Sequence, residues 1–221
     1  MEKKKILIIG CAIMKDELVH GQPDGISFTF LEQSLHRTPQ KMKEAIQEEI
    51  NKAEGWEGDS IILSYGLCSN GIVGIKANRH TLVIPRVHDC ITLFLGARER
   101  YLEEHQKEPG TYYLTRGWID EKKSPLGIYE EYCQKYGKET AEWAIREELK
   151  NYTRIALVES ELGVSDAHRK HARENAHFLN LRYEEIKGSL DFFRKIIQGP
   201  WDKDFVVLKP GEEATQEIFL E

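Results

Sequence analysis

Residues 81–96 read TLVIPRVHDCITLFLG. The apolar run TLVIP is typical of a buried strand, and ITLFLG begins a pattern typical of a helix. His88, Asp89 and Cys90 lie between the two. A strand that leads directly into a helix is the repeating unit of α/β proteins. A packed interior does not need these three residues at such a junction, so they either complete a turn or hold a ligand.

The same alternation extends through the chain on both sides of this stretch. We expect strands at residues 6–9, 59–68, 81–90, 153–160, 181–186 and 204–211, and helices at 39–54, 91–104, 166–178 and 189–199. Residues 108–120, EPGTYYLTRGWID, predict a strand or an ordered loop. The fold class that follows is α/β, with three layers around a mainly parallel, Rossmann-like sheet in one or two lobes.

Three segments are predicted along the chain. Residues 1–120 form a Rossmann-like α/β lobe that carries the Cys and His residues of interest. Residues 121–150 are highly charged, contain two helical stretches, and predict an insertion or lid. Residues 151–221 form a second α/β part, which either completes the sheet or makes a second lobe.

The charge, the apolar stretches and the cysteines of the chain argue against several classes of protein. The 221 residues carry a net charge of −6, which argues against a general nucleic-acid binder. No apolar stretch approaches the ~20 residues that cross a bilayer, so we expect no membrane partner and a cytoplasmic location. In such a compartment the four cysteines are more typical of reduced thiols than of disulfides.

Three of these cysteines follow predicted strands. Cys11 follows ILIIG, Cys68 follows IILSYGL and Cys90 follows LVIPRVHD. The carboxyl ends of parallel strands meet at one edge of a sheet, where α/β proteins bind ligands. With His88, these cysteines predict a metal site, most typically for zinc, with an iron–sulfur cluster as the alternative. Asp89 either orients a ligand or begins the following helix.

Other readings of the same residues stay open. Small cysteines also occur at strand ends for packing alone, and a Cys90 thiolate at a helix N-terminus suits a metal-free nucleophile or redox thiol. Glu17 and His20 follow Cys11 closely enough to supply an acid or base at the same edge. His36, ahead of a predicted helix, is a weaker candidate.

A glycine-rich turn follows the second predicted strand in YGLCSNGIVGI. Gly66, Asn70, Gly71 and Gly74 there could expose backbone N–H groups to a phosphate or carboxylate of a cofactor or substrate. The spacing is neither GxGxxG nor a phosphate-binding P-loop. A tight turn that positions Cys68 explains the pattern equally well.

The segments CAIMKDEL, SYGLCSNGIVGI, PRVHDCITLFLG and GTYYLTRGW together resemble domain-of-unknown-function family 1638. The resemblance implies a context of anaerobic metabolism beside corrinoid proteins and methyltransferases. His88, Cys90 and Cys68 resemble, in kind though not in order, the zinc site of thiol-dependent methyltransferases. The resemblance therefore implies a zinc enzyme or accessory protein of corrinoid-linked methyl transfer. Its small-molecule substrate would be a thiol, and its partner would be a corrinoid protein. A metal carrier or store, a thiol redox protein and an iron–sulfur protein are the alternatives.

Overall fold

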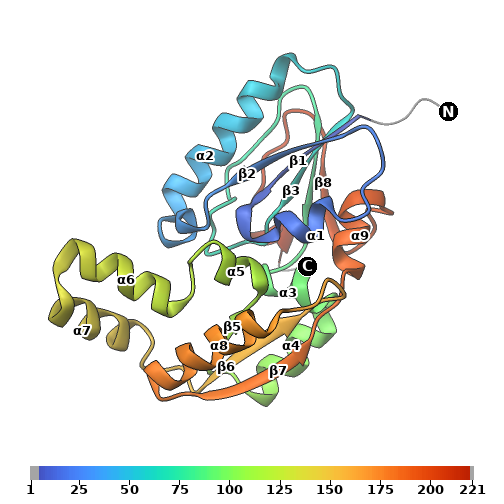
Figure 1. Cartoon of the computed structure of the whole chain (residues 1–221). Coiled ribbons are helices and arrows are strands. Elements are labelled where there is room, and N and C mark those ends of the chain that lie inside the picture. Colours follow the sequence, from blue (N-terminus) through green and yellow to red (C-terminus); the bar gives the residue numbers. More distant parts are fainter. Residues whose placement is uncertain (1–4, 220–221) are drawn as a thin grey trace. The chain divides into compact units, whose positions relative to one another are not determined.

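The computed structural model describes residues 5–219, which form two compact units with alternating strands and helices (Figure 1). Unit 1 contains the described residues up to Leu93 and those from Asp191 onward, and unit 2 contains Phe94–Leu190. The predicted α/β class with a mainly parallel sheet is confirmed. Within the described residues, no helix is both long and apolar enough to cross a bilayer.

Unit 1 is built on a five-stranded sheet with the order β2-β1-β3-β4-β8. Its strands are β1 (Ile6–Cys11), β2 (Ile26–Leu31), β3 (Ser60–Ser64), β4 (Thr81–Pro85) and β8 (Phe205–Leu208). The first four are parallel, and β8 pairs antiparallel with β4. The carboxyl ends of β1, β2, β3 and β4 therefore share one edge of the sheet.

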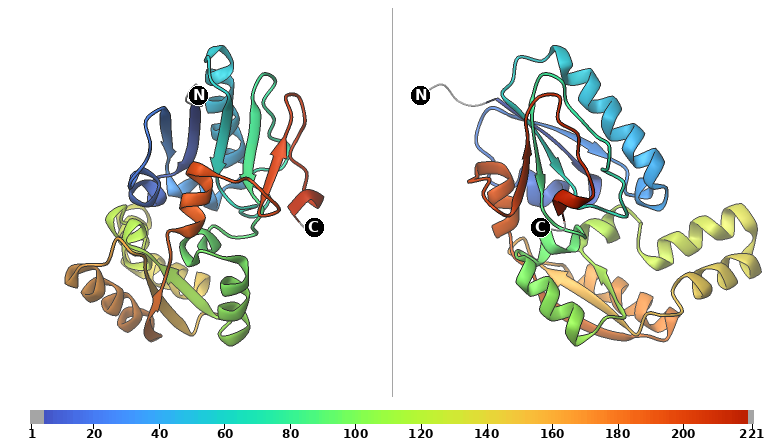
Figure 2. Two further views of the ribbon diagram at one scale, coloured as in Figure 1. Left: turned by 90° about the vertical axis from the view of Figure 1, so that its right-hand side faces the viewer. Right: turned by 180° about the vertical axis from the view of Figure 1, so that it is seen from behind.

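Helices cover this sheet on both faces. Its helical elements are α1 (Lys15–Val19), α2 (Pro39–Lys52), α9 (Asp191–Gln198) and the 3-10 turns η1 (Ala12–Met14), η2 (Gln33–Arg37), η3 (Ala53–Gly55) and η4 (Glu217–Phe219). Met42, Ile46 and Ile50 form the buried stripe of α2, and α9 lies on the opposite side of the sheet (Figures 1 and 2). The unit thus has the three predicted layers.

Two local features differ from the predictions. The strand β2, with the sequence ISFTFL, is part of the sheet although no strand was expected there. The single helix expected over residues 91–104 is two helices, α3 (Ile91–Leu95) and α4 (Arg98–Lys107). They are separated at Gly96, whose φ of +86° is left-handed and cannot continue a right-handed helix.

Unit 2 contains a separate three-stranded parallel sheet. Its strands are β5 (Thr111–Leu114), β6 (Arg154–Glu159) and β7 (Arg182–Lys187), in the order β5-β6-β7. Its remaining helices are α5 (Arg116–Asp120), α6 (Pro125–Tyr136), α7 (Lys138–Glu148) and α8 (Asp166–Leu179). The helices expected within residues 121–150 are α6 and α7, which pack against each other.

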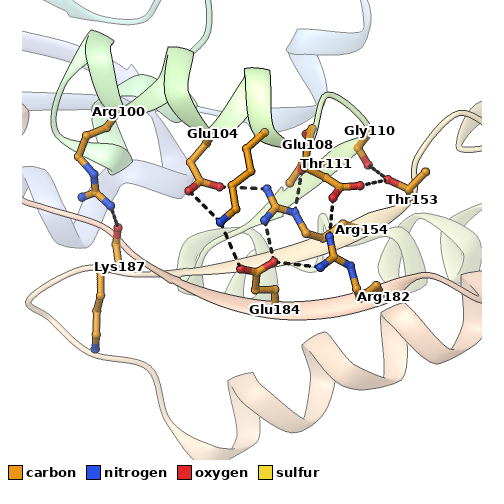
Figure 3. Close-up of polar contacts among 11 residues, drawn as sticks. Arg100, Glu104, Glu108, Gly110, Thr111, Thr153, Arg154, Arg182, Glu184 and Lys187 are labelled. Carbon is orange, nitrogen blue, oxygen red and sulfur yellow. Dashed lines mark hydrogen bonds and ion pairs between the residues drawn. The ribbon is translucent and has the colours of Figure 1, made fainter.

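A buried arginine joins the elements of this second sheet (Figure 3). Arg154 on β6 has no exposed side-chain surface. Its guanidinium donates to Thr111 Oγ1 at 2.9 Å, to Glu184 at 2.8 Å and to Glu104 at 3.0 Å. Because a buried charge is tolerated only when it is paired and hydrogen-bonded, this cluster fixes β5, β7 and α4 around β6.

The strand pairings divide the described strands between two sheets, and the predicted division at residues 120 and 150 stays a prediction. β5, β6 and β7 pair only with one another among the described strands, so unit 2 begins at Phe94 and includes the region expected to be an insertion. The last strand, β8, instead pairs with β4, and this returns the final segment of the chain to unit 1. The segment 151–221 is accordingly divided between the two sheets.

Candidate metal centre

Chemically reactive side chains follow all four parallel strands of unit 1 at their carboxyl ends. Cys11 is the last residue of β1, and His36 lies in η2, which follows β2. Cys68 and Cys90 lie in the loops after β3 and β4. In the order β2-β1-β3-β4 the direction of the crossovers reverses between β1 and β3, which is where ligand crevices form in open α/β sheets. The topology therefore gathers these residues at the ordinary binding edge of the fold.

Three of these side chains form a cluster with the composition of a metal site. The ligand atoms of His36, Cys68 and Cys90 all lie within 4.8 Å of one another. Zinc–sulfur bonds of about 2.3 Å and zinc–nitrogen bonds of about 2.0 Å place tetrahedral ligands roughly 3.5 Å apart. A small inward movement of these side chains is therefore enough to bind one ion. Two thiolates and an imidazole suit zinc and other borderline metals.

The hydrogen bonding of His36 leaves one ring nitrogen for a ligand. Nδ1 lies 3.1 Å from the carbonyl oxygen of Gln33, and because a carbonyl only accepts, Nδ1 carries the proton. Nε2 is buried and has no hydrogen-bond partner in the part of the chain that the structure describes. Metal-binding histidines typically donate one N–H to a backbone carbonyl and coordinate through the other nitrogen. His36 has this arrangement. Its ring also packs against that of Tyr65, with the two ring centroids 5.9 Å apart.

The electrostatics of the cluster favour a cation. Burial opposes a charge on His36, but the nearby sulfurs of Cys11 and Cys68 raise the pKa of its imidazole to about 11. A hydrogen bond with Cys90 lowers the pKa of the Cys68 thiol to about 6, although burial alone would raise it. The nearby His36 adds to this lowering. Cys68 and burial raise the pKa of Cys90 well above its usual value. The sulfurs thus attract positive charge, which a metal ion would supply while displacing protons.

The loops that carry Cys68 and Cys90 are bonded directly to each other. The N–H groups of Leu67 and Cys68 donate to the carbonyls of Val87 and His88 at 2.8 and 3.1 Å. Gly66 makes this approach feasible, since a Cβ there would lie 3.0 Å from the carbonyl oxygen of Val87. The two sulfur ligands are therefore positioned by one connected pair of loops.

The residues of the predicted metal site are only partly brought together. Cys68 and Cys90 lie in the cluster. Cys11 is buried close enough to His36 to influence its charge, but it is outside the group of three. The side chain of His88 is exposed and also outside it, whereas its backbone carbonyl binds the Cys68 loop. The imidazole beside Cys68 and Cys90 in the structure is that of His36, and the ligand roles of His88 and Cys11 stay predictions.

The other predicted site residues have identifiable local roles. Asp89 accepts a hydrogen bond from the N–H of Ile91 at 2.8 Å and so begins α3. Glu17 is 2% exposed on α1, and its acid–base role stays a prediction. In the glycine turn, Gly71 and Gly74 donate their N–H groups to the carbonyls of Cys68 and Ala214.

These two N–H groups are therefore already bonded within the protein. Gly66 approaches the neighbouring loop, and Asn70 is exposed with a left-handed backbone. Binding of an anion by this turn stays a prediction.

Comparison with known proteins identifies a family whose description names no activity. The family described as "Protein of unknown function (DUF1638)" matches residues 30–197, which contain His36, Cys68 and Cys90. The chain belongs to this family. A search of curated proteins finds no match.

A crystal structure of an uncharacterized protein from Bacillus cereus ATCC 10987, at 2.75 Å resolution, shares 14% identity with the chain. The alignment covers 86% of this chain and 54% of that one with a TM-score of 0.25, so the chain spans about half the length of that protein.

Proposed function

We propose that unit 1 binds one zinc ion through His36, Cys68 and Cys90 and uses it to activate a thiol for methyl transfer. The observation that best supports the metal site is that the sulfurs of Cys68 and Cys90 lie close to His36. The buried Nε2 of His36 has no hydrogen-bond partner among the described residues. Three protein ligands at a tetrahedral ion leave one position for an exchangeable group, as in catalytic zinc sites. A chain of this length can bury a core without a structural metal.

The chemistry follows from the ligand set and the open position. Zinc held there would lower the pKa of a coordinated thiol, so a bound substrate thiol would release its proton and be a thiolate at neutral pH. Cys68 is followed by the exposed residues Ser69 and Asn70, so in this proposal the substrate approaches the ion from the side of Cys68. The thiolate would attack the methyl group of a methylated corrinoid protein. A C–S bond would form and the C–Co bond would break, and the electron pair of the C–Co bond would stay on cobalt, which would go from Co(III) to Co(I).

The choice of the thiol and of the methyl donor rests on the family resemblance, whereas the metal rests on the cluster. In this proposal the protein acts as a metal-dependent methyltransferase, or as the accessory protein that prepares the thiol.

A metal carrier is the second candidate, and one observation favours it. The sulfur of Cys11 lies beside His36 and would supply a third thiolate to the ion. If it remained bound, the site would be closed with four protein ligands, which is typical of structural or storage sites. An iron–sulfur cluster would use the same thiolates and is distinguished by its colour.

Metal analysis of anaerobically purified protein tests the first step. One zinc per chain is expected in the wild type, with loss of the ion in Cys68→Ser and Cys90→Ser. Cys133→Ser, which alters a cysteine of unit 2, is the matched control and should retain zinc. A brown protein containing iron, or equal metal content in all four proteins, would refute the zinc assignment.

The second step is tested with zinc-loaded protein, a methylated corrinoid protein and a panel of thiols. Appearance of the Co(I) spectrum together with a thioether product is the expected result, and it should be absent in Cys68→Ser. No change in the cobalt spectrum with any thiol, together with transfer of zinc to an apo-protein, would support the carrier function instead.

A further inference from the structure

Cys11 occupies a distinctive place beside the proposed metal centre. It ends β1, the strand that lies between β2 and β3 in the sheet. The segment after β2 carries His36 and the loop after β3 carries Cys68, so the position of Cys11 at the sheet edge is between those of two ligands. It is nevertheless outside the group whose ligand atoms lie within 4.8 Å of one another.

Burial separates Cys11 from the side on which a substrate would arrive. Cys11 has 0% exposed surface, whereas Cys68 is partly exposed and is followed by the exposed residues Ser69 and Asn70. A metal held by His36, Cys68 and Cys90 would therefore have the buried thiol of Cys11 on the side of β1, whereas the chain becomes exposed directly after Cys68. These are two different sources for a fourth ligand.

We infer that Cys11 is an exchangeable fourth ligand, bound to the metal in the resting protein and displaced when a substrate thiol coordinates. This inference rests on the proposed function and deepens it by naming how the site opens. The sulfur of Cys11 lies outside the compact group of three, so Cys11 must move to reach the ion, whereas the loops of Cys68 and Cys90 are held to each other by hydrogen bonds.

The exchange is balanced in atoms and charge. The bond from the metal to the sulfur of Cys11 breaks, and a bond from the metal to the substrate sulfur forms. The proton of the incoming thiol passes to the sulfur of Cys11, so the metal keeps three thiolates and the net charge of the site is unchanged. No oxidant or reductant takes part. The metal site is closed without substrate and becomes reactive only when the thiol has replaced Cys11.

X-ray absorption at the zinc edge tests this with a selenol, 2-hydroxyethaneselenol, as the probe. X-ray absorption distinguishes selenium from sulfur among the atoms bound to zinc. Replacement of Cys11 by the selenol therefore lowers the number of bound sulfurs by one, whereas addition of the selenol without replacement leaves that number unchanged. In the resting wild type we expect three sulfurs and one nitrogen around zinc, and in Cys11→Ala two sulfurs and one nitrogen. With the selenol, both proteins should show two sulfurs, one nitrogen and one selenium.

The controls separate this inference from the proposed function. Cys133→Ala should behave as the wild type, and circular dichroism should show that Cys11→Ala is folded. Absence of zinc from the wild type would refute the proposed function and this inference together. Zinc with only two sulfurs in the resting wild type, or three sulfurs retained after the selenol is added, would refute the role of Cys11 alone.

Discussion

Replacing Gly66 by Ala should weaken metal binding through the backbone, without touching a ligand. The added Cβ would lie 3.0 Å from the carbonyl oxygen of Val87, 3.1 Å from its Cγ2 and 3.2 Å from the carbonyl carbon of Asp89. Ordinary contact begins at 3.4 Å, so the loops carrying Cys68 and Cys90 must separate by about 0.4 Å in a close-packed interior. This exceeds the roughly 0.2 Å within which metal–ligand distances are held.

The expected consequence is a loss of zinc affinity of roughly tenfold to a hundredfold, the range found when groups that orient ligands are changed. Overpacking should also lower the free energy of unfolding by about 1 kcal/mol. Competition with a chromogenic chelator measures the affinity, and thermal unfolding of the zinc-free protein measures the stability. Gly55→Ala is the control, because no atom lies within 4 Å of the added Cβ. Wild-type affinity in a destabilised Gly66→Ala protein would refute the idea that loop spacing sets the site.

Further predictions concern the imidazole ligand and the buried cation of unit 2. His36→Asn should lose the bound zinc measured after dialysis, and His88→Asn should keep it; the reverse result would restore His88 as the ligand. Arg154→Met should lower the free energy of unfolding in urea by about 3 kcal/mol, since it removes the buried partner of Glu104 and Glu184 and leaves them only the exposed cations of Lys107 and Arg182. An unchanged midpoint would contradict this. Arg154 lowers the pKa of Glu184, below its unfolded value of about 4.3. Their pairing therefore stabilises the folded protein above that pH, and this stability is lost as the pH falls through the folded pKa. Urea titrations at decreasing pH should show a steeper loss in the wild type than in Arg154→Met, and parallel curves would contradict it.

The sequence was most informative where strands are fully buried. β1, β3 and β4 lie inside the sheet, so their residues are apolar in unbroken runs that stand out from the loops around them. β2 is an edge strand with mostly half-buried residues and alternates with Ser and Thr, and its pattern is correspondingly weak. The pairing of β8 with β4 depends on contacts between distant segments, which no local pattern encodes. The α/β class was therefore predictable, whereas the pairing of β8 with β4 was not.

The same difference explains which site residues were found. Cys68 and Cys90 follow strong strand signals, so their position at one edge could be inferred. His36 follows β2, and without that strand it was only a histidine before a helix. The signal that could have identified it is the short apolar run ISFTFL, whose length and aromatic and β-branched content suit a strand. His88 was favoured because it is close to Cys90 in sequence, but at a loop the direction of each side chain is set by turn geometry.

The backbone at Cys68 supports a role beyond packing. Cys68, Ser69 and Asn70 have φ values of 46°, 56° and 66°, all left-handed. This conformation costs an L-residue about 1–2 kcal/mol, and Asn tolerates it best after Gly. Gly adopts this conformation without strain, whereas the first of these positions is a Cys. The hydrogen bonds to the loop after β4 offset part of the strain, and a bound metal, with a binding free energy on the order of 10 kcal/mol at a structural zinc site, would offset the rest. The strain at a cysteine that lies beside a second thiol and a histidine therefore agrees with the proposed metal site, because a bound ion would hold its sulfur at that point.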